Sequence, residues 1–245
     1  DYINLDTLLS LQQPKTSFPD EGVFIIYHQI TELYFKLALH ELSQLHEIES
    51  PSGKQVLQCV TRVNRYFKTL TDSFDVMVDG MERDQFLKFR MSLLPSSGFQ
   101  SGQYRFIEVA CTSFDRLMHA DKREESKGYA RSDIAGMYDE MYWRRGAVEL
   151  ASGKSTLTLL QFEDKYQEQI VELAEERHST NLNTLIEGLP KGERSPELIA
   201  ALRMLDAQIN INWPLSHYRS AVKYLQRNPE DIAATGGTNW QKYLP

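Results

Sequence analysis

The sequence predicts an all-α protein. Three observations support this class: long segments with apolar residues at helical spacing, few glycines and prolines, and no set of alternating strands. The 245 residues include 13 glycines and 9 prolines, and these gather between the periodic segments. We therefore predict a single helical domain over residues 1–245, built as a bundle with a ligand pocket between its helices.

The first expected helix covers residues 21–49 and carries two apolar stripes. Aliphatic side chains share one face, at Val23, Ile26, Ile30, Leu33 and Leu37. A narrower second face holds Phe24, His28, Thr31 and Phe35. One stripe is enough to dock a helix on a core. The second stripe, which is aromatic with one titratable group, therefore predicts the wall of a pocket.

Further helices are expected over residues 54–79, 82–93, 99–119, 160–187 and 196–227. Breaker clusters separate several of them, at residues 51–53 (PSG), 94–98 (LPSSG) and 188–190 (GLP). Residues 120–158 are polar and glycine-punctuated, and predict no particular element. Pro214 lies within the last expected helix, where it removes a backbone N–H and predicts a kink.

The composition excludes several classes of protein. The net charge is −7 with a pI near 5.4, and no basic run suggests a nucleic-acid groove. No apolar stretch is long enough to cross a bilayer and no signal peptide is visible, so a cytoplasmic protein is expected. Cys59 and Cys111 form no CxxC or CxxCH pattern, which argues against a cysteine zinc cluster and covalently attached heme.

Besides the aromatic stripe with His28, four features could carry chemistry. Phe86 and Arg90 are four residues apart on one helix face, which suits a carboxylate ligand beside an aromatic wall. Residues 95–101 (PSSGFQS) place hydroxyl and N–H donors before a helix. His217 is an imidazole on an apolar helix face, as in an axial heme ligand. Residues 234–238 (ATGGT) allow close backbone approach to a ligand.

Each feature alone also has a plain structural explanation. A lone histidine is more often a satisfied core residue, and an arginine on an apolar stem is more often solvated. A serine before a helix is an ordinary cap, and glycine-rich turns are common. Hydrolase, kinase and dinucleotide motifs such as HExxH, GxSxG and GxGxxG are absent from the sequence.

In this order along the chain, the five features resemble the tryptophan 2,3-dioxygenase family. The resemblance is strongest in residues 2–45 and 84–108, and moderate around residues 213–217 and 235–237. It is weak between residues 110 and 205. The combination of FII-x-HQ at residues 24–29 with PSSGFQS at residues 95–101 is specific to this family.

The resemblance implies a helical homotetramer that binds heme b. It implies a heme-dependent oxidoreductase that adds O2 to the indole C2–C3 bond of L-tryptophan or a substituted tryptophan, by default giving N-formylkynurenine. The proximal iron ligand falls on His217, spaced from Trp213 as in the family. The distal histidine that faces the indole N–H falls on His28.

The remaining family roles fall on substrate-binding residues. Phe24 and Phe86 match the aromatic walls, and Arg90 matches the arginine that pairs with the substrate carboxylate. Ser97 matches the serine beside the heme edge and the substrate. Thr235 matches the threonine at the substrate's amino acid end, and Tyr2 matches an N-terminal tyrosine that reaches a neighbouring subunit's pocket.

The sequence departs from the family pattern near its C-terminal end. The usual GTGGS turn is ATGGT at residues 234–238, followed by Asn239 and Trp240, and the interval from His217 to Thr235 is longer. These changes leave open a monooxygenase that makes an oxindole or hydroxylated product. A heme-binding sensor without turnover and a heme-free helical scaffold are the non-enzyme alternatives.

Overall fold

The structure is a computed structural model that describes residues 2–90, 101–123, 133–146, 155 and 157–225. Within these ranges the regular structure is helical and no strand forms, which confirms the predicted all-α class. An isolated antiparallel bridge joins Met118 to Met141. No described helix is long and apolar enough to cross a membrane.

The longer helices are α2 (Pro19–His46), α3 (Gly53–Ser73), α6 (Gly102–Cys111), α10 (Leu157–Arg177), α12 (Pro196–Ala207) and α13 (Trp213–Leu225). The shorter helices are α1 (Leu5–Leu9), α4 (Asp75–Val78), α5 (Arg83–Phe89), α7 (Ala120–Arg123), α8 (Ile134–Tyr138), α9 (Tyr142–Gly146) and α11 (Leu182–Gly188). Two 3-10 turns, η2 (Phe114–Leu117) and η4 (Lys191–Glu193), and a π-helical segment, η5 (Gln208–Asn212), are also present.

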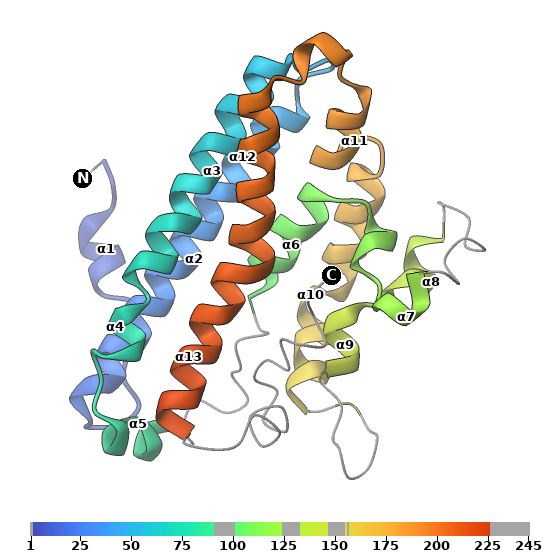
Figure 1. The fold of residues 1–245 in the computed structure, drawn as a ribbon. Coiled ribbons are helices and arrows are strands. Elements are labelled where there is room, and N and C mark those ends of the chain that lie inside the picture. Colours follow the sequence, from blue (N-terminus) through green and yellow to red (C-terminus); the bar gives the residue numbers. More distant parts are fainter. Residues whose placement is uncertain (1, 91–100, 124–132, 147–154, 156, 226–245) are drawn as a thin grey trace.

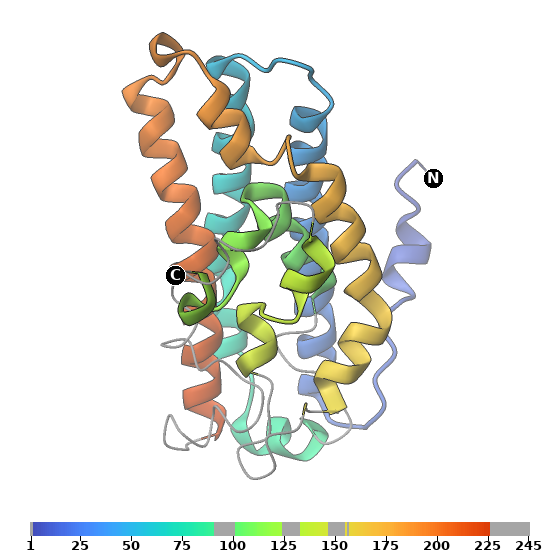
Figure 2. The ribbon, with the colours of Figure 1, turned by 90° about the vertical axis from the view of Figure 1, so that its right-hand side faces the viewer.

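Helices α2, α3 and the α12–α13 rod lie side by side as the main bundle (Figure 1). Helix α6 crosses between this bundle and α10, and it contacts both α2 and α10. Figure 2 shows α10 running alongside the bundle, with α1 on the outside. Helix α5 closes one end of the bundle, where it contacts α2 and α13.

Serine caps fix where several helices begin. The Ser52 side chain accepts a hydrogen bond from the Gln55 N–H, and the Gln55 side chain accepts one from the Ser52 N–H, so α3 starts with a capping box. The Ser101 side chain caps α6 by accepting a hydrogen bond from the Tyr104 N–H, and Ser195 caps α12 ahead of a proline at its first position. These local signals agree with the breaker clusters in the sequence.

The main core lies between α2, α3 and the α12–α13 rod. Phe35 is 2% exposed, and its ring centroid lies 5.9 Å from that of Phe67, 5.6 Å from Tyr104 and 5.5 Å from Trp213. The buried face of α2 is therefore the face that carries Thr31 and Phe35. Burying aromatic rings of this size contributes several kcal/mol to folding.

The expectation that the aliphatic stripe of α2 docks on the core is wrong for most of its length. Ile26, Ile30, Leu33 and Leu37 are 40–46% exposed. Val23 alone of this stripe packs against the main core. Helical spacing shows which residues share a face, but the neighbouring helices decide which face is covered.

Several expected helices are shorter than the sequence suggested. The helix expected over residues 99–119 ends at Cys111, because Thr112 and Ser113 are extended before η2 begins. The helix expected over residues 160–187 divides at Asn181, whose side chain caps α11 by accepting a hydrogen bond from the Thr184 N–H. Phe74 divides α3 from α4 within the segment expected over residues 54–79.

The last long helix forms as expected, and Pro214, where a kink was predicted, directly follows the first residue after a π-helical segment. The π-helical segment η5 immediately precedes α13, and Pro214 is the second residue of α13. A proline ring clashes with the carbonyl group four residues earlier in a regular α-helix. The wider π turn relieves that clash, so α12 and α13 continue as one rod.

A second hydrophobic cluster lies between α6, α8, α9 and α10. Its buried members include Met118, Tyr138, Met141 and Ile170. Arg105 and Glu108 of α6 form an ion pair beside this cluster, with Arg105 Nη1 2.5 Å from Glu108 Oε2. The Tyr142 hydroxyl bonds to both side chains, so α9 is tied to α6.

Candidate functional site

His28 lies on α2 and stacks on Phe24, with ring centroids 3.9 Å apart. Its Nδ1 lies 2.8 Å from the Phe24 carbonyl oxygen, which can only accept, so Nδ1 carries the proton and Nε2 presents a lone pair. The His28 side chain is exposed. Loss of hydration nevertheless lowers the pKa of His28, and the Phe24 carbonyl and the charge of Glu32 oppose this effect. The His28 ring is therefore neutral at neutral pH and accessible to a ligand.

His217 lies on α13 and faces the same region. Its Nδ1 lies 3.4 Å from the Trp213 carbonyl oxygen, a long hydrogen bond that again directs Nε2 away from the backbone. Burial and, to a smaller extent, the charge of His28 lower the His217 pKa to about 4, against the opposing effect of the Trp213 carbonyl. Because His28 perturbs His217, the structure brings the two predicted histidines near one another.

Aromatic side chains surround both imidazoles. The His217 ring centroid lies 4.7 Å from that of Phe74 and 4.6 Å from that of Trp213. Phe74 also contacts Trp213 edge to face, at 5.4 Å between centroids. These contacts fix the position of His217 through packing, since edge-to-face pairs are favourable beyond their buried area.

Helix α5 supplies the other wall. The Phe86 ring centroid lies 6.4 Å from that of Phe24 and 4.8 Å from that of Tyr224, so it bridges α2 and α13. Phe89 contacts Phe24 at 5.9 Å. Arg90 directly follows α5 and is half-buried. The structure therefore gathers five predicted residues around one region: Phe24, His28, Phe86, Trp213 and His217, with Arg90 at its edge.

The other predicted site residues are not placed there by the structure. Tyr2 is fully exposed, so it contributes to no pocket of its own chain. Ser97 and Thr235 lie outside the described residues, as do the whole turn over residues 234–238 and Trp240.

Sequence reasoning missed the roles of Phe74, Phe89 and Tyr224 in this site. Phe74 is a buried core residue at the end of α3, and its ring also lies against His217. The Tyr224 hydroxyl donates to the Val78 and Met81 carbonyl oxygens, which anchors the ring against Phe86. Tyr224 lies seven residues after His217, and this two-turn spacing was the available signal.

The residues present fit a heme. A neutral imidazole with a free Nε2 lone pair is the form that ligates iron, and a pKa of about 4 keeps His217 neutral at physiological pH. No group of three or more His, Cys, Asp or Glu side chains gathers in the described ranges. A single imidazole in aromatic surroundings suits a metal whose other ligands come from a macrocycle, rather than a bare ion.

Comparisons with known proteins identify the family of the chain. A family model described as tryptophan 2,3-dioxygenase matches residues 1–130, which is just over half of the chain. A tryptophan 2,3-dioxygenase of Ruegeria sp. is 44% identical over 109 residues, covering 44% of this chain and 39% of the relative. One from Anaeromyxobacter dehalogenans is 39% identical over 131 residues, covering 53% and 49%. One from Bradyrhizobium diazoefficiens is 37% identical over 147 residues, covering 58% and 52%.

The chain thus spans about half the length of the relatives it matches. The region matched by the family model holds Phe24, His28, Phe86 and Arg90. His217 lies beyond it, and its place beside His28 comes from the fold. With the family model matching more than half of its length, the chain belongs to the tryptophan 2,3-dioxygenase family.

Proposed function

We propose that this chain is a heme-dependent dioxygenase that adds both atoms of O2 to the C2–C3 bond of L-tryptophan, giving N-formylkynurenine. The observation that supports this most directly is the pair His28 and His217, which lie near one another among aromatic side chains with each Nε2 directed away from its own helix backbone. One imidazole can bind iron while the other faces a substrate. The relatives bear the name of this activity.

His217 is proposed to hold heme b, and Trp213 to orient the imidazole through its carbonyl group and its ring. When bound, the heme supplies the iron that activates O2. Ser97 is proposed to lie at the heme edge and to contact the substrate. The protein's own part would be to hold a neutral imidazole for the iron and to exclude water from around it.

His28 is proposed to orient the indole as the catalytic residue of this chain. With its Nδ1 proton held by the Phe24 carbonyl, His28 Nε2 accepts a hydrogen bond from the indole N–H. Burial lowers the His28 pKa, which keeps the ring in this accepting form at neutral pH. Phe24 and Phe86 provide the apolar walls that an indole needs.

The amino acid end of the substrate needs its own partners. Desolvating a zwitterion without compensation costs several kcal/mol. Arg90, which follows α5 at the edge of the site, is proposed to bind the carboxylate, because a guanidinium pairs with it through two hydrogen bonds. Thr235 is proposed to contact the same end, and Tyr2 to enter the pocket of a neighbouring subunit.

A homotetramer is proposed as the working assembly. The exposed aliphatic stripe of α2 at Ile26, Ile30, Leu33 and Leu37 supports an assembly, because a row of exposed aliphatic side chains is costly to leave in water. The full exposure of Tyr2 is consistent with a role outside its own chain. The cytoplasmic location and the single domain over residues 1–245 stay predictions.

The deciding experiment is mass spectrometry of the product formed from L-tryptophan under 18O2 by the reduced, heme-loaded protein. Two labelled oxygen atoms in N-formylkynurenine are expected. One labelled oxygen would favour the monooxygenase, and a heme spectrum without turnover of any indole would favour the sensor. A colourless protein that takes up no added hemin would overturn the heme assignment altogether.

Two substitutions test the assigned roles. His217→Ala is expected to abolish heme uptake or change the ferrous heme spectrum, and an unchanged spectrum would move the ligand elsewhere. Arg90→Ala is expected to lower kcat/KM for L-tryptophan by about 2–5 kcal/mol in transition-state binding. Lys88→Ala is the matched control, since Lys88 is an exposed cation on the same helix. Equal kinetics for the two variants would remove Arg90 from the site.

A further inference from the structure

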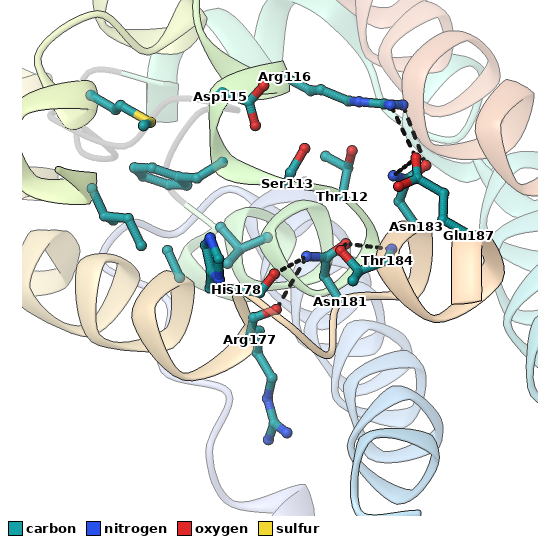
Figure 3. A pocket seen from close by; sticks show the side chains of 15 residues that line it. Thr112, Ser113, Asp115, Arg116, Arg177, His178, Asn181, Asn183, Thr184 and Glu187 are labelled. Carbon is teal, nitrogen blue, oxygen red and sulfur yellow. Dashed lines mark hydrogen bonds and ion pairs between the residues drawn. The ribbon is translucent and has the colours of Figure 1, made fainter. Parts of the chain in front are cut away.

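A pocket lies beside the C-terminal end of α6. Its volume is about 370 Å³, which is in the range of pockets that hold small organic ligands. It is formed where α6 passes into η2, beside α8 and the turn between α10 and α11 (Figure 3). Of the predicted heme and tryptophan residues that the structure describes, none lines it.

The floor of this pocket is apolar. Buried side chains of the second hydrophobic cluster form it, and each is at most 6% exposed: Val109, Phe114, Ile134, Met137 and Ala174. Because these side chains are almost fully covered by their neighbours, only their outermost atoms face the pocket. An apolar group placed there gains roughly 25 cal/mol for each Å² of the small apolar area that it covers.

Four polar side chains converge above that floor. Figure 3 shows Thr112, Ser113 and Asp115 with their oxygen atoms toward the hollow, and His178 facing them from the end of α10. Within the described part of the chain, none of these four side chains makes a hydrogen bond or an ion pair. Their bonding capacity is therefore available to a ligand.

The other polar side chains of the lining are already committed. Arg116 lies 3.4 Å from Glu187 and 3.3 Å from Asn183 Oδ1, and Asn183 also bonds to Glu187. The Asn181 amide bonds to the Arg177 and His178 carbonyl oxygens and caps α11. These contacts hold the side chains of the pocket wall in place. The charges of Arg116 and Glu187 cancel each other where α11 lines the pocket.

Arg177 does not supply a positive charge to the hollow. Its side chain extends away from the other labelled residues in Figure 3. It lies instead near His46, whose pKa it helps to lower. The uncompensated charge that faces the pocket is thus the carboxylate of Asp115, flanked by two hydroxyl groups that can also accept.

We propose that this pocket binds a small primary amine with an apolar body about the size of one aromatic ring. An ammonium group carries three N–H donors, and Asp115, Ser113 and Thr112 offer three acceptors. The apolar body rests on the floor formed by the second cluster. A carboxylate ligand would instead meet the charge of Asp115, so the pocket discriminates by charge. This site is separate from the proposed tryptophan site.

The test uses the full chain loaded with heme and three probes of similar shape: 2-phenylethylamine, 2-phenylethanol and 3-phenylpropanoate. Isothermal titration calorimetry at constant pH and ionic strength is expected to give one saturable site for the amine. The alcohol is expected to bind at least about tenfold more weakly, and the carboxylate not at all. Equal affinity for the amine and the alcohol would overturn the proposal.

Isosteric variants locate the binding site. Asp115→Asn is expected to weaken amine binding at least about tenfold, and Thr112→Val about threefold, without loss of the folded circular dichroism spectrum. Glu176→Gln, an exposed carboxylate on α10 outside the pocket, is the matched control and is expected to change affinity less than twofold. Unchanged binding in Asp115→Asn would refute the site.

The amine could instead enter the histidine site, and two readouts separate these cases. Saturating L-tryptophan is expected to leave amine binding unchanged, and the amine is expected to leave the heme absorption band unchanged. Displacement by L-tryptophan, or a shift of that band, would place the amine beside His28 and His217 and overturn the proposal.

Discussion

Replacing Glu108 by glutamine should destabilise the fold strongly, because it isolates a buried guanidinium. Arg105 and Glu108 are each 3% exposed, and they are in direct contact. Burial raises the Glu108 pKa, and the charge of Arg105 opposes this, so Glu108 depends on Arg105 to stay ionised. Glutamine keeps the shape of Glu108 and removes its charge.

The expected loss is about 3–5 kcal/mol in the free energy of unfolding. Two unit charges roughly 4 Å apart attract by about 4 kcal/mol at an effective dielectric constant of 20. The Arg105 charge keeps some stabilisation in the variant, because its guanidinium also faces three aromatic rings. It lies 5.0 Å from the ring centroid of Tyr104, 5.3 Å from that of Tyr142 and 4.9 Å from that of Trp143. Cation–π contacts of this kind contribute about 0.5–2 kcal/mol each.

The assay is urea unfolding followed by circular dichroism, at one protein concentration for all variants. The double variant Arg105→Met with Glu108→Leu removes both charges and should recover most of the loss, because apolar residues can replace a buried pair. Asp72→Asn breaks the exposed Lys68–Asp72 pair and should cost less than about 0.5 kcal/mol. A loss below about 1 kcal/mol for Glu108→Gln, or a double variant no more stable than the single one, would refute this reasoning.

Two further predictions concern stability. Gly22→Ala should stabilise α2 by up to about 1 kcal/mol, since nothing lies within 4 Å of the new methyl group. Gly53→Ala should destabilise the protein, because its methyl group would lie 2.2 Å from the Glu193 carbonyl oxygen. Thermal melting of both variants checks the two signs. Burial, aided by the charge of Arg177, lowers the His46 pKa from 6.5 to about 4. As the pH falls, the unfolded chain therefore binds a proton at His46 before the folded chain does. The free energy of unfolding should fall by up to about 3 kcal/mol as the pH drops from 6.5 to 4. In His46→Gln, the free energy of unfolding should depend less on pH between 6.5 and 4. An unchanged dependence on pH would contradict the role of His46.

The sequence predicts the long helices and much of the site, but not what covers them. The four-residue spacing correctly places Phe24 against His28, because both residues lie in the same helix. The stripe at Ile26, Ile30 and Leu33 was expected to face the core and is exposed. Its pattern is that of a buried face, and only the tertiary arrangement decides whether another helix lies against it.

The second cluster illustrates a different limit. The Arg105–Glu108 pair has an ordinary helical spacing, which in a sequence suggests a solvated ion pair. Its burial depends on Tyr142, which lies 37 residues from Arg105 in the chain, within a segment whose composition predicted no element. Long-range contacts of this kind leave no local periodic signal, so neither the cluster nor the pocket above it could be predicted.

The π-helical segment η5 also affects how much the chain can change in length. A π turn holds one residue more than the α-turn it replaces, so the rod from α12 to α13 carries a spare residue at Gln208–Asn212. Deletion of one residue from η5 would convert the π turn into an α-turn and leave Trp213 and His217 facing the same neighbours. This also requires replacing Pro214, because its ring needs the wider turn. Loss of one residue within α13 would instead rotate the remainder of that helix by about 100°. Insertions and deletions in homologous chains should therefore concentrate in this one turn of the rod.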